Sequence, residues 1–371
     1  MHAQQSPVYK GIKIQHLNAT TYTIPTDLPE SDGTLAWDST TLVLIELEAG
    51  GKKAIGFTYA NACLLPFIHH TLKPLLIGKN PMDIASLMHS LTVAIRNEGN
   101  SGLVARALSA IDVALWDLKA KILGLPLCKL LGMVKAEVAV YGSGGFTSYT
   151  AKQLQTQLEG WANEGFSAVK MKIGRNPDKD LLRIKNAKAV IGQANLMVDA
   201  NGAYDAKTAL SKAIEFTDYG INWFEEPVSS DDLAGLNFIR NHAPAKINIA
   251  AGEYGDNYHY FYNMLQAKAV DVLQADASRC GGITGFIKAG KLAEAFHIPF
   301  SFHCAPSLHL HPATSLNSFT IGEYFHDHVR IESLFFDGFV KPKNGMMIPD
   351  LERYGLGLTF KHQDAEKYKI N

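Results

Sequence analysis

The chain has 371 residues, of which 47% are hydrophobic and 19% are charged, and its formal net charge is −1. This length is enough for two or three domains with a large core, and the near-neutral charge argues against a nucleic acid or an acidic membrane as partner. No run reaches the roughly 20 apolar residues of a membrane span. The four cysteines lack paired spacing and residues 1–5 lack the pattern of a secretory leader, so we expect a reducing compartment, the cytoplasm.

The first third of the chain predicts an α+β domain over residues 1–131. Apolar and polar side chains alternate along residues 11–60, which predicts strands, and Gly50-Gly51 predicts a hairpin turn. Helical patterns follow at residues 64–76, 81–95 and 101–123, and the last helix is expected to end near Gly124.

A second region, residues 132–331, alternates short apolar runs with helical segments, which is typical of a barrel of parallel strands. Its first strand is predicted at residues 138–141, and Ser143 in the following loop could bind a carboxylate or hydroxyl group. The next strand, residues 168–172, ends in Lys170 and Lys172. Because side chains alternate along a strand, both lysines face the same side. Mutual repulsion between two buried lysines is expected to lower their pKa and to free a neutral amine as a base.

Three acids follow the next three apolar runs, each about one strand and one helix apart: Asp199, Glu225 and Glu253. In a parallel barrel the carboxyl ends of the strands converge on one face, where active sites form. Three carboxylates at that face suit Mg²⁺, which prefers oxygen ligands. Each acid alone could equally cap the next helix, but three in phase favour a metal site.

Two further strands are predicted to end at Asp276 and His303, and a last one at Glu323. A carboxylate that holds one imidazole nitrogen makes the other nitrogen an acid/base group. His303 alone could be an ordinary core histidine, but its place in the series favours a functional role. The remaining residues, 332–371, are rich in Gly and Pro and predict loops and short strands.

The motifs as a set resemble the enolase superfamily, and within it the mandelate racemase subgroup. The resemblance spans essentially the whole chain and is carried by Lys170-Met171-Lys172, Asp199-Ala200-Asn201, Phe224-Glu225-Glu226-Pro227, Gly252-Glu253, Asp276-Ala277-Ser278-Arg279-Cys280-Gly281-Gly282, His303 and Glu323.

The resemblance implies a modified TIM (β/α)7β barrel, an α/β fold, with the first domain as a cap that the C-terminal tail completes. It also implies that Asp199, Glu225 and Glu253 bind Mg²⁺. Lys172 would be one general base with Lys170 beside it, and His303 with Asp276 would be a second on the opposite face of the substrate. Glu323 would hydrogen-bond a substrate carboxylate oxygen. Similar proteins are often dimers or octamers, so a homo-oligomer is expected.

In proteins of this kind two loops of the first domain cover the barrel mouth, here expected at residues 26–37 and 58–63, although both could be ordinary surface turns. The candidate mouth residues are mostly polar: Asn61, Ser143, Asn201, Ser278, Arg279, His309 and His311. Of these, Asn61, Ser143, Asn201 and His309 are our candidate substrate contacts.

Polar contacts favour a small carboxylate substrate with many hydroxyl groups, a sugar acid, and hence a dehydratase that yields a 2-keto-3-deoxy acid. The alternatives are a racemase or epimerase of a 2-hydroxy acid, a lactone cycloisomerase, and a non-catalytic sugar-acid binding protein.

Two other patterns carry little weight. Residues 285–291 fit part of a phosphate-binding loop, but Leu292 replaces the hydroxyl residue and the segment predicts a helix. His303, Cys304, His309 and His311 lack the spacing of a zinc site, and the last two are expected to line the site or to cover its rim.

Overall fold

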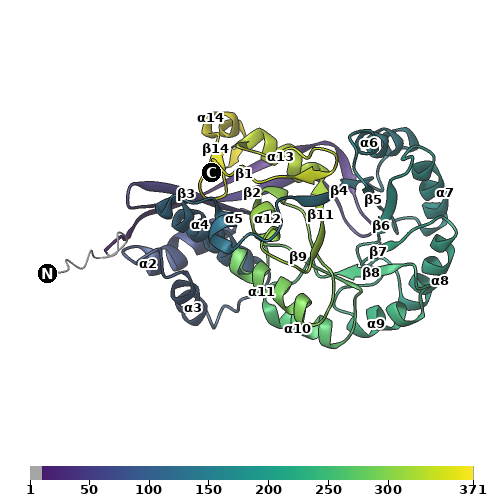
Figure 1. The fold of residues 1–371 in the computed structure, drawn as a ribbon, viewed down its shortest axis with the longest axis horizontal. Helices are drawn as coiled ribbons and strands as arrows, with labels where there is room; N and C mark the ends of the chain where they lie inside the picture. Colours follow the sequence, from purple (N-terminus) through teal and green to yellow (C-terminus); the bar gives the residue numbers. More distant parts are fainter. Residues whose placement is uncertain (1–10, 371) are drawn as a thin grey trace.

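The computed structural model describes residues 11–370, so the expected absence of a leader at residues 1–5 lies outside the described residues. The chain forms an antiparallel capping sheet and a closed parallel barrel, which lie side by side in Figure 1. The predicted α/β barrel with an N-terminal cap is therefore confirmed. The domain boundaries at residues 131/132 and 331/332 stay predictions.

The capping sheet has the strand order β15-β1-β2-β3 and is antiparallel throughout. Its strands are β1 (Ile14–Ser31), β2 (Ala36–Ala49), β3 (Lys52–Tyr59) and β15 (Lys369–Ile370). The predicted turn at Gly50 and Gly51 is present, and both residues have positive φ angles of 56° and 69°.

Residues 26–37 were expected to form a loop, but most of them extend β1 and β2 as a hairpin. Glu30 pairs with Trp37 and Ser31 with Ala36, and the ladder is irregular between Pro25 and Glu30. The irregular stretch contains Asp27 and Pro29, which fit poorly into a regular ladder of backbone hydrogen bonds. We call residues 25–37 the capping hairpin.

Helices pack against one face of the capping sheet. They are α1 (Leu64–Phe67), a π-helical turn (Ile68–Leu72), α2 (Lys73–Leu76), α3 (Ile84–Ala94) and α4 (Gly102–Leu123), whereas Leu127 of the short helix α5 (Leu127–Leu131) packs with the opposite face of the sheet. Gly56 of β3 lies so close to α4 that a Cβ atom there would be 2.1 Å from the carbonyl oxygen of Ala110. Only glycine permits this approach, which brings the α4 residues Ala107, Ala110 and Ala114 into the apolar core.

The barrel contains eight parallel strands, and pairing of β11 with β4 closes it. The strands are β4 (Val138–Gly144), β5 (Ala168–Lys172), β6 (Asn195–Asp199), β7 (Trp223–Glu225), β8 (Asn248–Ala251), β9 (Val272–Ala275), β10 (Phe300–Phe302) and β11 (Phe319–Phe325). The helices between them are α6 (Ala151–Asn163), α7 (Pro177–Lys188), α8 (Ala206–Thr217), α9 (Leu233–His242), α10 (Tyr258–Gln266), α11 (Gly282–Ala295) and α12 (Pro306–Ala313). A helix follows each strand from β4 to β10, so the expected (β/α)7β pattern is confirmed.

The C-terminal segment connects the barrel back to the cap, as expected. It consists of α13 (His326–Phe335), β12 (Phe336–Asp337), β13 (Met346–Met347), β14 (Thr359–Phe360), α14 (His362–Ala365), a 3-10 turn (Glu366–Tyr368) and β15. β13 pairs with barrel strand β4, whereas β15 pairs with capping strand β1. The tail therefore binds both parts of the molecule.

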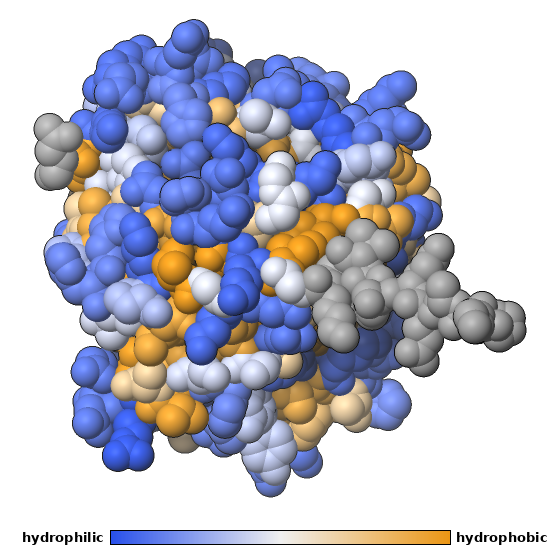
Figure 2. Space-filling view, turned by 90° about the vertical axis from the view of Figure 1, so that its left-hand side faces the viewer, coloured by the Kyte–Doolittle hydropathy of each residue, from blue (hydrophilic) through white to orange (hydrophobic). Residues whose placement is uncertain are grey.

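Figure 2 views the end of the molecule that the capping domain forms. Hydrophilic residues cover most of this face, and apolar residues gather in an irregular band across its middle. Among the described residues, no helix combines the length and the apolar character needed to cross a membrane.

Candidate active site

The three predicted metal ligands meet at the carboxyl end of the barrel. Asp199 and Glu225 are the last residues of β6 and β7, where they lie side by side in the sheet register, and Glu253 follows β8. One carboxylate oxygen from each acid lies within 4.8 Å of the other two, and all three side chains are buried. We call these three residues the acid triad.

The acid triad fits a divalent cation with oxygen preference. Burying three carboxylates together is costly unless positive charge compensates them. Oε2 of Glu253 is buried and accepts no hydrogen bond from the described residues, so it is free to bind an ion. The donor set, three carboxylate oxygens without imidazole or thiolate, matches Mg²⁺.

The two lysines of β5 supply the positive charge in the structure. Nζ of Lys172 lies 2.5 Å from Oδ2 of Asp199, whereas Lys170 pairs with Glu225 and lies 2.8 Å from Oε1 of Glu323. Burial by itself lowers the pKa of each ammonium group, but the surrounding carboxylates outweigh burial and hold both pKa values above their ordinary range. The expectation that mutual repulsion frees a neutral amine is therefore wrong: each lysine faces carboxylates, which favour the charged form.

The predicted pair of Asp276 and His303 also forms. Nδ1 of His303 lies 2.9 Å from Oδ2 of Asp276, and Nε2 is 3.4 Å from Oε2 of Glu253. Burial by itself raises the pKa of Asp276, but the hydrogen bond with His303 and the charge of Arg279 hold that pKa well below its usual range. The Asp276 carboxylate thus keeps Nε2 directed toward the acid triad, where it can exchange a proton.

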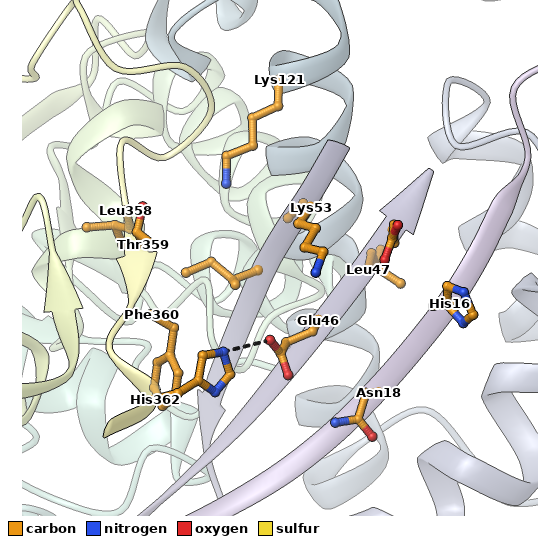
Figure 3. A pocket seen from close by; sticks show the side chains of 13 residues that line it. His16, Asn18, Glu46, Leu47, Lys53, Lys121, Leu358, Thr359, Phe360 and His362 are labelled. Carbon is orange, nitrogen blue, oxygen red and sulfur yellow. Dashed lines mark ion pairs between the residues drawn. The ribbon is translucent and has the colours of Figure 1, made fainter. Parts of the chain in front are cut away.

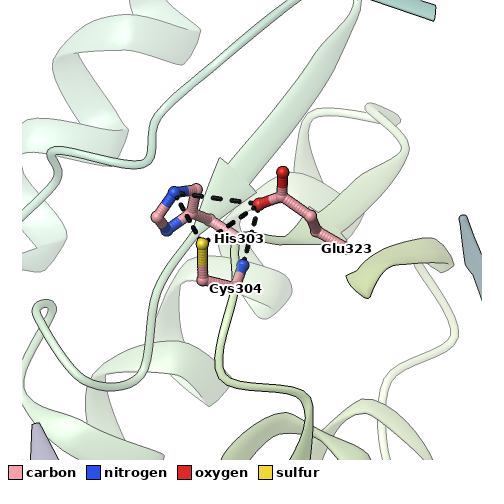
Figure 4. Close-up of side chains that lie close together, drawn as sticks. All are labelled: His303, Cys304 and Glu323. Atoms are coloured by element: carbon pink, nitrogen blue, oxygen red, sulfur yellow. Dashed lines mark hydrogen bonds and ion pairs between the residues drawn. The ribbon is translucent and has the colours of Figure 1, made fainter. Parts of the chain in front are cut away.

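Glu323 lies between the lysines and the imidazole. It accepts hydrogen bonds from Oγ of Ser143 at 2.6 Å and from the backbone N–H of Cys304 at 2.9 Å. Figure 4 shows the Cys304 thiol beside it, with Sγ 3.1 Å from Nε2 of His303 and 3.4 Å from Oε2 of Glu323. Positive φ angles at Cys304 and Ala305, 50° and 38°, turn the chain sharply after His303 and place the thiol in the site.

The structure separates the four candidate substrate contacts. Ser143 is buried against Glu323, and Asn201 lies beside the acid triad, with its backbone N–H 2.9 Å from Oδ1 of Asp199. Oδ1 of Asn201 is buried without a hydrogen-bond partner in the described part of the chain. Asn61 is exposed, and its Oδ1 accepts a hydrogen bond from the backbone N–H of Cys63.

His309 and His311 lie behind the site, in the core, rather than on the mouth. Nε2 of His309 accepts from the backbone N–H of Ala277 at 2.7 Å, and Nδ1 donates to carbonyl oxygens of the preceding turn. His311 is held in the same way by the backbones of Cys128 and Leu356, and burial lowers its pKa to about 4. Both side chains are buried and both nitrogens of each ring are engaged by the backbone, so neither histidine covers the rim, although Nε2 of His309 lies 3.8 Å from Oδ1 of Asp276.

Two residues that sequence reasoning missed orient Glu225. Nε1 of Trp223 and Nε2 of Gln274 donate to Oε2 of Glu225 at 2.9 and 3.0 Å. Trp223 precedes Glu225 by two residues and Gln274 precedes Asp276 by two, so strand alternation places them on the interior side. The alternation of side chains along these strands could therefore have identified both residues from the sequence.

The two expected capping segments both reach the barrel mouth. Thr34 of the capping hairpin approaches the carbonyl oxygen of Asn201, and Thr147 after β4 donates to the carbonyl oxygen of Asp32 at 2.8 Å. From the second segment, Oγ1 of Thr58 donates to the carbonyl oxygen of Ser278 at 2.7 Å. The cap therefore contacts the loops that follow β4, β6 and β9 at the barrel mouth.

A groove of about 440 Å³ lies elsewhere, on the capping sheet (Figure 3). Strands β1 to β3, Lys121 of α4 and the tail line it, and Glu46 forms an ion pair with His362 across it at 3.2 Å. This groove is separate from the acid triad.

Known proteins are similar to this chain in sequence and in fold. Residues 20–132 match the N-terminal domain of the mandelate racemase/muconate lactonizing enzyme family, and residues 153–365 match the enolase C-terminal domain-like family. A solved mandelate racemase/muconate lactonizing enzyme-like protein from Rubrobacter xylanophilus is 47% identical, with a TM-score of 0.94 over 96% of this chain and 100% of that chain.

Several relatives have named activities. The L-talarate/galactarate dehydratase of Salmonella typhimurium is 30% identical over 87% of this chain and 81% of its own length, and its structure superimposes with a TM-score of 0.90. The arabinonate dehydratase of Saccharolobus solfataricus is 30% identical over 88% of this chain and 90% of its own. The L-Ala-D/L-Glu epimerase of Bacillus subtilis is 30% identical over 62% of this chain and 61% of its own.

Magnesium is present in related structures: a variant of the Salmonella enzyme is liganded with Mg and L-glucarate, and a racemase from Streptomyces coelicolor has bound magnesium. With both domains matched, the chain belongs to the enolase superfamily, in its mandelate racemase/muconate lactonizing enzyme subgroup.

Proposed function

We propose that this protein is an acid-sugar dehydratase, which removes the proton next to a carboxylate and expels the β-hydroxyl group as water. One observation carries the proposal: a lysine and an imidazole approach the acid triad from two sides. Lys172 lies at Asp199 and His303 lies at Glu253. Dehydratases among the relatives, which act on talarate, galactarate and arabinonate, support this choice of reaction.

The reaction begins with the weakly acidic α-proton, whose removal places a second negative charge on the carboxylate. Mg²⁺ bound at the acid triad would supply positive charge that stabilises this negative charge and, by neutralising the carboxylates, would lower the pKa of Lys172 toward that of a base. Lys172 or His303 accepts the proton as the C–H bond breaks. The protonated partner then gives a proton to the β-hydroxyl, the C–O bond breaks and water leaves.

The product of that step is an enol, which tautomerises to a 2-keto-3-deoxy acid. Glu323, which accepts a hydrogen bond from Ser143 at its Oε1, would hold a proton and donate it in a hydrogen bond to the substrate carboxylate, since two ionised carboxylates cannot bond each other. Loss of one such stabilising contact typically costs about 2.7–4 kcal/mol of barrier.

Racemisation or epimerisation of a 2-hydroxy acid is the second candidate. It is favoured by the same pair of acid/base groups, since return of a proton from the other side inverts the α-carbon. Similarity to an epimerase supports this candidate as well.

The test is incubation of the Mg²⁺-loaded protein with galactarate, talarate, arabinonate and other sugar acids, followed by detection of 2-keto acids. We expect a 2-keto-3-deoxy product, lost in Lys172→Ala and retained in Lys207→Ala, which changes a lysine on α8. Inversion without a keto product would select the epimerase, and tight binding without either reaction would identify a sugar-acid binding protein.

A further inference from the structure

A second group of possible metal ligands lies apart from the acid triad, where the capping hairpin meets α13. Asp27 and Glu30 belong to the irregular end of β1, and His326 is the first residue of α13, directly after β11. One ligand atom from each of the three residues lies within 4.8 Å of the other two. We call these three residues the hinge cluster.

The hinge cluster joins two parts of the fold that are far apart in the sequence. Nε2 of His326 lies 3.1 and 3.0 Å from the two carboxylate oxygens of Asp27. The side chains of Asp27 and His326 are 44% and 23% exposed. An ion could therefore reach the cluster from solvent without unfolding the cap.

Glu30 gives an independent reason to expect a ligand. It is only 1% exposed, and its Oε2 accepts a hydrogen bond from Nε1 of Trp37 at 2.8 Å. Its other oxygen, Oε1, is buried and has no hydrogen-bond partner within residues 11–370. A buried carboxylate oxygen without a donor is costly, and a bound cation would remove that cost.

The local charge also matches a divalent ion. Asp327, buried next to His326, adds a third carboxylate, and Arg330 pairs with it at 2.5 Å. Arg330 thus compensates the charge of Asp327. The carboxylates of Asp27 and Glu30 remain for a bound cation to compensate.

We propose that the hinge cluster binds a divalent first-row transition ion such as Zn²⁺, through Asp27, the free Oε1 of Glu30 and Nε2 of His326. An imidazole together with two carboxylates favours such an ion over Mg²⁺, which prefers oxygen ligands alone. The ion would tie the capping hairpin to the end of β11, the strand that carries Glu323. It would therefore brace the cap over the barrel mouth, whichever reaction the protein catalyses.

The experiment is titration of the full chain with Zn²⁺ by calorimetry, in saturating Mg²⁺ to fill the acid triad. Glu30→Gln keeps the size of the side chain and the bond to Trp37, and His326→Gln removes the imidazole. We expect each variant to lose at least about tenfold in Zn²⁺ affinity, while His259→Gln, on an exposed face of α10, binds like the parent.

A rival Zn²⁺ site exists at His303, Cys304 and Glu323, which also lie close together. Loss of Zn²⁺ binding in Cys304→Ser, with unchanged binding in Glu30→Gln, would overturn the proposal. Anomalous diffraction from crystals of the parent protein soaked in Zn²⁺ locates the bound ion directly, so this test needs no variant. A peak between Asp27 and His326 supports the hinge site, and its absence at that position while the triad is filled contradicts it.

Discussion

At the scale of single residues, the two acid/base groups stand in different electrostatic surroundings. Lys172 faces carboxylates, which favour its charged form until positive charge arrives in the acid triad. His303 is held by Asp276, whose carboxylate in turn is close to Arg279, with Nε of Arg279 3.5 Å from Oδ2. The charge of Lys172 therefore depends on the acid triad, whereas the orientation of His303 depends on Asp276.

The role of Asp276 can be tested by replacing its charge and keeping its shape. In Asp276→Asn the imidazole loses the carboxylate that fixes its tautomer and orientation, so turnover should fall by about 10²–10⁴-fold. We expect this loss of kcat at an unchanged melting temperature. A lower melting temperature with kcat of the folded protein unchanged would instead indicate a merely structural role.

The positions of the site residues at strand ends could be predicted because side chains alternate along a strand and the strands of a parallel barrel run in one direction. That regularity predicted which site residues lie at strand ends, and the structure brings them together: Lys170, Lys172, Asp199, Glu225, Asp276 and His303. His309 and His311 lie on α12 instead, where orientation depends on how the helix packs. They lie deeper than expected because every residue of α12 is buried, and no local pattern reveals that this helix lies inside the molecule.

At the scale of elements, the capping hairpin depends on close contact with the barrel. A Cβ atom at Gly33 would lie 2.2 Å from the carbonyl oxygen of Ala200 and 2.7 Å from that of Ile173. Both neighbours are backbone atoms of the barrel loops, which have little room to move. Glycine at this position therefore sets how near the hairpin tip lies to the site.

Gly33→Ala should push the hairpin away from the barrel and lower kcat/KM by about tenfold or more, because small displacements of a cap disturb substrate positioning. The matched control is Gly160→Ala in α6, where a Cβ atom meets nothing within 4 Å. That change should leave kcat/KM unaltered and stabilise the helix by up to about 1 kcal/mol. Equal activity of the two variants would contradict the role of Gly33.

The junction of α4 and α11 carries a buried acid that makes stability depend on pH. Asp112 accepts hydrogen bonds from the backbone N–H and the hydroxyl group of Thr284, yet burial raises its pKa to about 7. Because the folded pKa exceeds the unfolded value, its contribution to stability is fully present below about pH 4 and is lost as pH rises through about 7.

Asp112→Asn removes this titration. Between pH 5 and pH 8 the parent should lose about 2 kcal/mol more unfolding free energy than the variant, which calorimetric melting at the two pH values will measure. Glu332, whose pKa burial also raises to about 7, contributes equally to both proteins and cancels in the comparison. Identical pH slopes would show that Asp112 stays ionised in the folded protein.

At the scale of the whole molecule, the C-terminal segment holds the cap and the barrel together. Phe360 of β14 is 6% exposed and packs against Tyr22 of the capping sheet and Phe335 of α13. Phe360→Ala should cost about 3 kcal/mol of unfolding free energy. Leu351→Ala, at a position 40% exposed, should change the melting temperature little. A similar melting temperature for both would mean that the tail adds nothing to stability.

The overall architecture was predictable because the apolar runs and helical segments of the barrel repeat regularly. The extended capping hairpin was not, since Pro and Asp at residues 25–32 are typical of loops and contacts with residues far away in the sequence, Thr147 and His326 among them, hold it in place. The hinge cluster could not be predicted from the sequence either. Its residues lie at positions 27, 30 and 326, and no local pattern connects them.

The central claim is that Lys172 and His303 exchange the α-proton of a carboxylate substrate from two sides of the acid triad. It is tested most directly by NMR of α-proton exchange in D₂O, with the Mg²⁺-loaded protein, a library of sugar acids and hydroxy acids, and the variants Lys172→Ala and His303→Asn. We predict deuterium uptake or a 2-keto product in the parent. The product should be lost in both variants, whereas deuterium uptake should be lost in the variant that lacks the attacking base. Exchange that persists unchanged in both variants, or no exchange with any acid while Mg²⁺ is bound, would contradict the claim.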